Sequence, residues 1–334
     1  MKKKKIILSY DYELFFGDRS GTVLKSIIEP TNKLMDVMEQ NGFRGNFFVD
    51  YLMFSELEKL SDERAVSDLK LLKDQVRDMV RRGHRIELHL HPHWIDAKYN
   101  GDGTWDFDDF THYSLSSLDE ETIVRMFKEG TEYLNGLCGE VEPDYKVVAF
   151  RAGGWAVQPF YKLKRGFEES GIKIDSSSSF GAYSAKENQG YDFRVMPQKS
   201  IYRFYDDVCK EDENGPFVEV PITCYKQNQL FKLLSKIYLK IGLTERLTDG
   251  THRRGASAVE VLKKTSLLKR LTTLYYQMFS FSQFPAINLK MVLLFTKKDL
   301  ICAIDHPKDY SRETEDGIKA MKRFGSSYTY KDLL

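Results

Sequence analysis

Short apolar runs alternate with longer stretches of helical periodicity along most of the chain. The short runs predict strands at residues 5–11, 44–52, 85–91, 146–154, 172–179, 215–223 and 299–306. Apolar residues spaced three or four apart predict helices at residues 30–42, 67–84, 119–137, 159–171 and 311–325. Strands and helices that alternate in this way are typical of a parallel α/β sheet or barrel.

The segment 225–282 breaks this rhythm. It carries 11 Lys or Arg against 3 acidic residues, with long helical patterns and no clear strand. In residues 229–242 the apolar side chains fall on one helical face and three lysines fall on another. We interpret the segment as a basic helical insertion. Its lysine edge is either solvated on the protein surface or rests on an anionic membrane or a phosphorylated carrier.

Charge and cysteine usage narrow the class of protein. The chain of 334 residues has 50 basic and 49 acidic residues, and this balance does not indicate a nucleic-acid partner. Its four cysteines show no C-x-x-C spacing, which favours free thiols in a reducing compartment. The apolar run at the basic N-terminus covers only residues 6–8, too short for the core of a signal peptide. We therefore expect a cytoplasmic protein.

Three histidines, His89, His91 and His93, occupy alternate positions in GHRIELHLHPHW. On a continuous strand the first and third would lie about 13 Å apart, at about 3.3 Å per residue, which is too far for one ion. Either a neighbouring pair binds a metal, or the chain turns and brings His89 and His93 together. Pro92 lacks a backbone donor and favours the turn.

Other chemically useful side chains stand where predicted strands end. Asp11 and Glu13 end the first strand, Arg151 stands near the end of the fourth, and Asp305 and His306 end the last. Active sites of barrels and open α/β sheets gather at the carboxyl ends of their strands. One such residue alone is commonly a turn former or a surface group. Together they supply a carboxylate base, metal ligands, an arginine and a histidine acid.

The order of these motifs resembles the polysaccharide deacetylases of the NodB-homology class, carbohydrate esterase family 4. SYDYE is similar to the family's opening acid pair, GHRIELHLHPH to its histidine motif, FRAGGW to its arginine motif and CAIDH to its last strand. The resemblance implies a distorted (β/α)7 barrel. With it, residues 1–334 form one domain that includes the basic insertion at about 225–282.

The resemblance also implies a metal site. The metal histidines of the family are spaced H-x-x-x-H, which points to His89 and His93 rather than His91, with Glu13 as the third ligand. Two imidazoles and one carboxylate suit a single divalent ion, and Zn²⁺ is the expected one. His91 stays an alternative, because H-x-H spacing also has the necessary reach.

The remaining roles follow from what the family needs for amide hydrolysis. Asp11 is the implied general base and Arg151 the residue that holds it in place. The backbone N–H of Gly154 is the implied oxyanion donor and His306 the general acid. Two departures bear on these roles, since Gly153 replaces the usual proline of the arginine motif and Glu13 replaces the usual aspartate.

The expected substrate is an acylated amino sugar or oligosaccharide that loses an N-acetyl or other small acyl group. Without a secretion signal, an intracellular or lipid-carrier-linked precursor of a surface polysaccharide is favoured, handled at the inner face of the membrane through the basic segment.

Two other functions stay open at this point. One is a metal-dependent hydrolase of the PHP or amidohydrolase type that uses an H-x-H pair, although those folds usually place this pair at the first strand. The other is a catalytically silent carbohydrate-binding protein on the same barrel, although every catalytic group is present.

Overall fold

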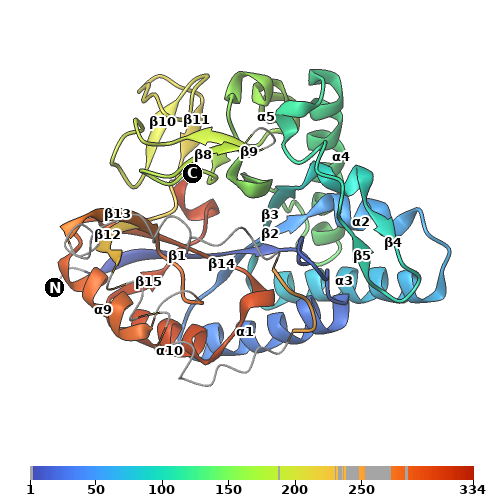
Figure 1. Cartoon of the computed structure of the whole chain (residues 1–334), viewed down its shortest axis with the longest axis horizontal. Coiled ribbons are helices and arrows are strands. Elements are labelled where there is room, and N and C mark those ends of the chain that lie inside the picture. Colours follow the sequence, from blue (N-terminus) through green and yellow to red (C-terminus); the bar gives the residue numbers. More distant parts are fainter. Residues whose placement is uncertain are drawn as a thin grey trace.

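The computed structural model describes residues 3–186, 189–229, 231, 235, 237, 248–252, 272–282 and 285–334. In these residues the fold is built on a curled sheet (Figure 1). Its parallel strands follow one another in the order β11 (Phe217–Glu219), β7 (Ile174–Asp175), β6 (Ala149–Ala152), β3 (Arg85–Leu90), β2 (Gly45–Asp50), β1 (Lys4–Tyr12) and β14 (Leu300–Asp305). The α/β class and the distorted barrel of the NodB type are thereby confirmed.

Two further strands extend this sheet, and three two-stranded antiparallel sheets lie outside it. β10 (Tyr202–Phe204) pairs antiparallel with β11, and β15 (Gly325–Ser327) pairs with the start of β1. The two-stranded sheets pair β4 (Lys98–Tyr99) with β5 (Trp105–Asp106), β8 (Tyr183–Lys186) with β9 (Gln189–Asp192), and β12 (Cys224–Asn228) with β13 (Leu274–Met278).

Helices surround the sheet on its outer side (Figure 1). They are α1 (Glu29–Gln40), α2 (Tyr51–Glu58), α3 (Glu63–Arg81), α4 (Glu120–Gly139), α5 (Lys164–Ser170), α9 (Ala286–Phe295) and α10 (Arg312–Met321). Short helical turns complete the described elements: η1 (Leu24–Ile28), η2 (Pro92–Asp96), η3 (Leu115–Ser117), η4 (Gly153–Trp155), η5 (Phe160–Lys162), η6 (Pro307–Asp309) and η7 (Lys331–Leu333). Contacts run from α9 to α10, from α10 to α1, from α3 to α4 and from α4 to α5.

Along β1, the side chains that pack beneath the helices alternate with side chains on the opposite face of the sheet, where the polar residues lie. Ile6 and Leu8 join the large apolar cluster beneath the helices, whereas Ile7 joins a smaller cluster on the opposite face of the sheet. Because successive side chains of a strand point to opposite faces, Ser9 and Asp11 lie on the same face as Ile7. The inner face of the sheet therefore carries the polar residues towards the carboxyl end of β1.

The predicted strands and helices are found close to their expected positions, but two helices, α2 and α9, were not predicted and one segment is corrected. Residues 51–58 form α2, although the apolar pattern extends the preceding strand to residue 52. Segment 225–282 was expected to lack strands, but β12 and β13 stand at its ends. They pair with each other, and this pairing is not visible in either stretch alone. The predicted helix over 229–242 lies largely outside the described residues.

None of the helices in the described part of the chain combines the length and apolarity required to cross a bilayer.

Candidate active site

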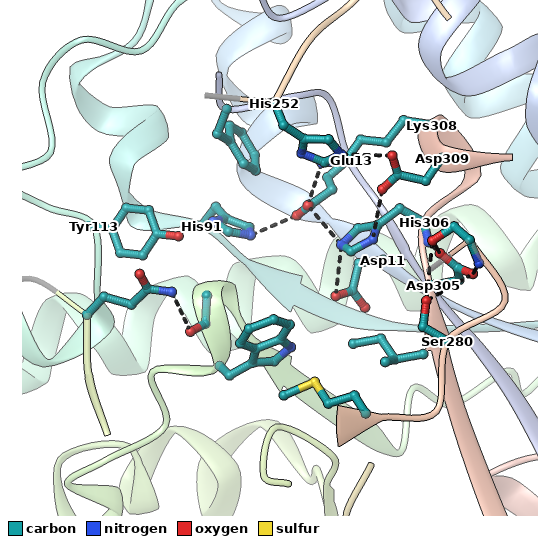
Figure 2. A pocket seen from close by; sticks show the side chains of 17 residues that line it. Asp11, Glu13, His91, Tyr113, His252, Ser280, Asp305, His306, Lys308 and Asp309 are labelled. Atoms are coloured by element: carbon teal, nitrogen blue, oxygen red, sulfur yellow. Dashed lines mark hydrogen bonds and ion pairs between the residues drawn. The ribbon is translucent and has the colours of Figure 1, made fainter. Parts of the chain in front are cut away.

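A cavity of about 520 Å³ opens at the carboxyl ends of the strands (Figure 2). Loops after β1 and β14 supply most of its polar lining, and aromatic residues from other loops supply its walls. The lining includes Asp11, Glu13, Phe16, His91, Tyr113, Gly154, Trp155, Gln189, His252, Asp305, His306, Lys308 and Asp309. The side chains singled out at separate strand ends are thus brought to one place.

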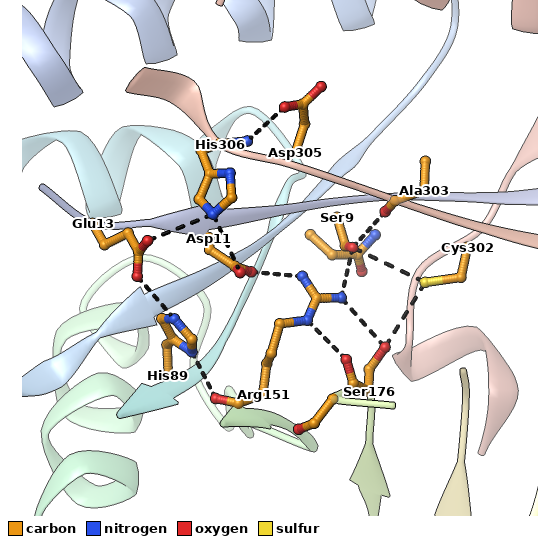
Figure 3. Close-up of polar contacts among 12 residues, drawn as sticks. Ser9, Asp11, Glu13, His89, Arg151, Ser176, Cys302, Ala303, Asp305 and His306 are labelled. Carbon is orange, nitrogen blue, oxygen red and sulfur yellow. Dashed lines mark hydrogen bonds and ion pairs between the residues drawn. The ribbon is translucent and has the colours of Figure 1, made fainter. Parts of the chain in front are cut away.

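Asp11 is paired with Arg151 at the base of this site (Figure 3). Nη1 of Arg151 donates to Oδ1 of Asp11 at 2.6 Å, and the guanidinium is fully buried. The other donors reach Ser9 Oγ at 2.8 Å and the carbonyl of Ser176 at 2.8 Å. Burial raises the pKa of Asp11, but Arg151, His89 and His306 together outweigh it and hold the pKa below the ordinary value. Asp11 is therefore an ionised carboxylate held in one orientation.

Glu13 is the centre of a second cluster. Its Oε2 lies 3.0 Å from Nε2 of His89 and 2.7 Å from Nε2 of His91, and its Oε1 accepts from Nζ of Lys308 at 2.7 Å. Burial opposes ionisation of Glu13, but Lys308 and the two histidines lower its pKa well below the usual range. One ligand atom from each of Glu13, His89 and His91 lies within 4.8 Å of the other two.

The second nitrogen of His89 defines its tautomer. Nδ1 lies 2.6 Å from the carbonyl of Arg151, its neighbour across the β3–β6 pairing, and a carbonyl can only accept. Nδ1 therefore carries a proton, and Nε2 carries a second one, which it donates to Oε2 of the ionised Glu13. Burial lowers the pKa of His89, but Asp11 and Glu13 raise it to about 9. An imidazole fixed in this way by a backbone carbonyl is typical of metal ligands.

His93 does not belong to this group. The strand ends at Leu90 and Pro92 begins the turn η2, which carries the His93 ring into an aromatic cluster. The ring stacks on Tyr113 with centroids 5.3 Å apart and meets Phe16 edge-on at 4.2 Å. Both of its nitrogens are buried without a hydrogen-bond partner among the described residues. The structure thus brings His91, rather than His93, next to Glu13 and His89.

His306 lies between the two carboxylates (Figures 2 and 3). Its Nε2 is 3.7 Å from Oδ2 of Asp11 and 3.5 Å from Oε1 of Glu13, and its Nδ1 is 3.6 Å from Oδ2 of Asp309. Burial and the Lys308 charge lower the pKa of His306, against the acids around it. The second oxygen of Asp309 lies 2.8 Å from Nε2 of His252.

Gly154 lines the cavity in a backbone conformation that suits glycine. Its φ is +57°, and an added Cβ would lie 2.6 Å from the ring of Tyr113. Nε2 of Gln189 donates to its carbonyl at 3.0 Å, which ties the loop to the β8–β9 sheet. The next residue, Trp155, also has a positive φ of 61° and lines the cavity. Trp94 and Trp105 are buried and do not line it.

Asp175 lies away from the cavity lining. Its carboxyl accepts from the hydroxyl of Ser177 at 2.7 Å and is buried beside Glu219. Burial raises the pKa of Glu219 well above the ordinary value, and the Asp175 charge adds to this. Ser177 in turn accepts from the backbone N–H of Ala152 at 2.8 Å. Asp175 therefore supports the strand that carries Arg151.

The sequence did not single out Lys308 or Asp309. Both follow His306 within three residues in HPKD, and their short spacing from a strand-end histidine was the available signal. Tyr113 stands in a loop and Gln189 begins β9, and the sequence around each carries no such signal.

Comparison with known proteins gives the family. The family model described as polysaccharide deacetylase matches residues 1–165, which include β1, β2, β3 and β6 with Asp11, Glu13, His89 and Arg151. No curated protein matches the chain. Residues 1–165 belong to the polysaccharide deacetylase family, whose members are hydrolases that act on carbon–nitrogen bonds other than peptide bonds.

Solved structures that resemble the chain are distant. A Mycobacterium smegmatis protein assigned to the polysaccharide deacetylases shares 14% identity, with 97% of this chain and 83% of that chain covered and a TM-score of 0.46. A Bacillus cereus polysaccharide deacetylase shares 10% sequence identity, with 98% of this chain and 94% of that chain covered and a TM-score of 0.42. A 4-alpha-glucanotransferase from Thermococcus litoralis shares 11% sequence identity, with 99% of this chain and 40% of that chain covered and a TM-score of 0.49.

Proposed function

We propose that the protein is a metal-dependent N-deacetylase of an acylated amino sugar. The observation that carries this is the meeting of three groups at one end of the sheet. These groups are the Asp11–Arg151 pair, the cluster of Glu13 with two histidines, and His306. Their residues come from the carboxyl ends of four strands, β1, β3, β6 and β14, as in barrel enzymes whose catalytic residues come from several strands.

Glu13, His89 and His91 are the residues that would hold the metal. Two imidazoles and one carboxylate are a donor set that suits Zn²⁺ or a similar divalent ion. The orientation of His89 by the Arg151 carbonyl supports this set, because it directs Nε2 towards Glu13, where a metal ion would take the place of the Nε2 proton. When bound, a divalent ion supplies Lewis-acid activation of a water molecule and of the acyl oxygen. The family spacing implies His93 as the third ligand, but the geometry favours His91, which lies beside Glu13 and His89.

The proton transfers are assigned to Asp11 and His306. Asp11, kept ionised by Arg151, takes a proton from the attacking water as the carbon–oxygen bond forms. The N–H of Gly154 donates to the oxygen that becomes negative. His306 then protonates the leaving nitrogen as the carbon–nitrogen bond breaks, which releases the free amine and a carboxylate. Its lowered pKa makes the imidazolium a stronger proton donor.

Metal content of the purified protein tests this proposal. Elemental mass spectrometry is expected to find about one divalent ion per chain in the wild type, and none in His89→Ala or His91→Ala. His93→Ala is the matched control and is expected to keep the metal. Loss in His93→Ala with retention in His91→Ala would support the family spacing instead. If no variant, the wild type included, takes up metal under loading, the proposed function is wrong.

We further propose that the substrate is presented at an anionic lipid surface, as a lipid-linked sugar would be. The support comes from α9, which follows the basic segment in the chain and is apolar on its outer side. Ile287, Met291, Leu294 and Phe295 are exposed, the last by 76%. Residues three, four, seven and eight positions apart share one helical face, and the exposed Lys290 and Lys297 flank this one.

Sedimentation with lipid vesicles tests the lipid surface. The wild type is expected to sediment with vesicles that contain phosphatidylglycerol and to stay free with phosphatidylcholine alone. Replacing both Ile287 and Phe295 by Ser is expected to abolish sedimentation, whereas Tyr161→Ser, at another exposed position, is expected to leave it unchanged. Equal sedimentation of both variants would contradict a role for α9.

A further inference from the structure

Lys308 is a buried lysine at the centre of the site. It stands in η6, two residues after His306, and only 3% of it is exposed. Its Nζ donates to Oε1 of Glu13 at 2.7 Å and to the carbonyl of Leu14 at 2.7 Å. The ammonium also lies 5.3 Å from the ring centre of Phe15 and 5.1 Å from that of Phe16.

Such burial requires a reason. A lysine is almost never fully buried unless it is paired, because removing its charge from water is costly. Here the cost is offset by one charge-assisted bond to a carboxylate, one to a carbonyl, and the two aromatic faces. Lys308 thereby links the loop after β14 to the loop after β1. None of the steps assigned above uses this residue.

The position of the ammonium divides the two oxygens of Glu13 between different partners. Oε1 faces Lys308, and Oε2 faces His89 and His91. Without Lys308, Oε1 would lie buried with Nε2 of His306, at 3.5 Å, as its remaining partner among the described residues. A carboxylate released on one side can turn about its last bond and present both oxygens to one partner.

We propose that Lys308 is a positioning residue that restricts Glu13 to binding a metal through Oε2 alone. This inference rests on the proposed function, because it concerns the same metal site. By holding Oε1, the ammonium keeps one more coordination position open for water and substrate than a two-oxygen carboxylate would. It also keeps His306 from pairing fully with Glu13, so that this histidine stays available to the leaving group.

The test uses the full chain loaded with Co²⁺, whose visible absorptivity falls as its coordination number rises. Lys308→Met removes the charge at nearly equal length, and Lys308→Arg keeps it. The matched control is Lys322→Met, at an exposed lysine outside the cavity lining. Lys308→Met is expected to lose absorptivity per bound cobalt and to lower kcat about 10–100-fold with KM little changed. Lys308→Arg is expected to restore the wild-type spectrum, and Lys322→Met to leave it unchanged.

The outcomes separate this inference from the proposed function. If the wild type binds no cobalt, the metal site itself is wrong. If it binds cobalt and Lys308→Met has the same spectrum and kcat, only the role of Lys308 is overturned. A drop in kcat without a spectral change also overturns it, because a purely structural role would produce that pattern. If thermal melting shows that Lys308→Met is unfolded, the same comparison is made with Lys308→Gln, which is neutral but retains one donor.

Discussion

Replacing Asp11 by Asn is expected to lower kcat by about 10²–10⁴-fold, the usual contribution of a general base. The amide keeps the size of the side chain and can still accept from Arg151, so the fold around it should survive. It cannot take a proton from water. The measurement is acetate release from the best substrate in a screen of N-acetylated amino sugars.

Two comparisons give this result its meaning. Asp11→Asn is expected to retain the bound metal, because Asp11 is not among the grouped ligands, whereas His89→Ala is expected to lose it. Asp18→Asn changes an exposed acid on the loop after the same strand and is expected to keep full activity. An Asp11→Asn variant with wild-type kcat would show that the base is another residue.

Replacing Arg151 by Met is expected to destabilise the protein by about 3–5 kcal/mol, because it leaves the Asp11 charge buried without its partner. Arg151 is fully buried, donates to Asp11, Ser9 and Ser176, and lies 4.1 Å above the ring of Phe48. Urea denaturation near pH 7 measures the free energy of unfolding of the variant and the wild type. Activity is expected to fall as well, since Asp11 loses its orientation.

The double variant Arg151→Met with Asp11→Asn is the sharper control. Removing both charges leaves no unpaired buried ion, so part of the lost stability is expected to return. Arg165→Met removes an arginine that pairs with Glu121 and Glu169 at the surface, and it is expected to change the free energy of unfolding little. If Arg151→Met cost no more than Arg165→Met, the buried pair would not be the reason for the stability of this site.

The sequence by itself determined the order of the strands along the chain and the strand ends at which the candidate site residues stand. Strands that are buried on both faces leave continuous apolar runs, so β1, β2, β3 and β14 were predicted close to their observed bounds. The carboxyl ends of parallel strands meet at one edge of the sheet. Asp11, Glu13, Arg151 and His306 could therefore be expected to meet before any distance was known, although their roles stay proposals.

Only the tertiary structure decided which histidine approaches Glu13. The sequence argument used Pro92 to bring His93 back towards His89, but the turn that begins at Pro92 carries His93 into contact with Phe16 and Tyr113. The direction of a turn depends on what it packs against, and these aromatic partners are distant in sequence from His93 or lie in an irregular loop.

The same reason applies to the partners that the sequence analysis did not find. Lys308 and Leu14 are separated by 294 positions, and their contact exists because β14 pairs with β1. β12 and β13 likewise become strands through each other, across a segment whose composition indicates helix. Local patterns determine which elements form and which residues stand at their ends. Contacts between distant residues depend on how the sheet curls, and these contacts decide how the site is arranged.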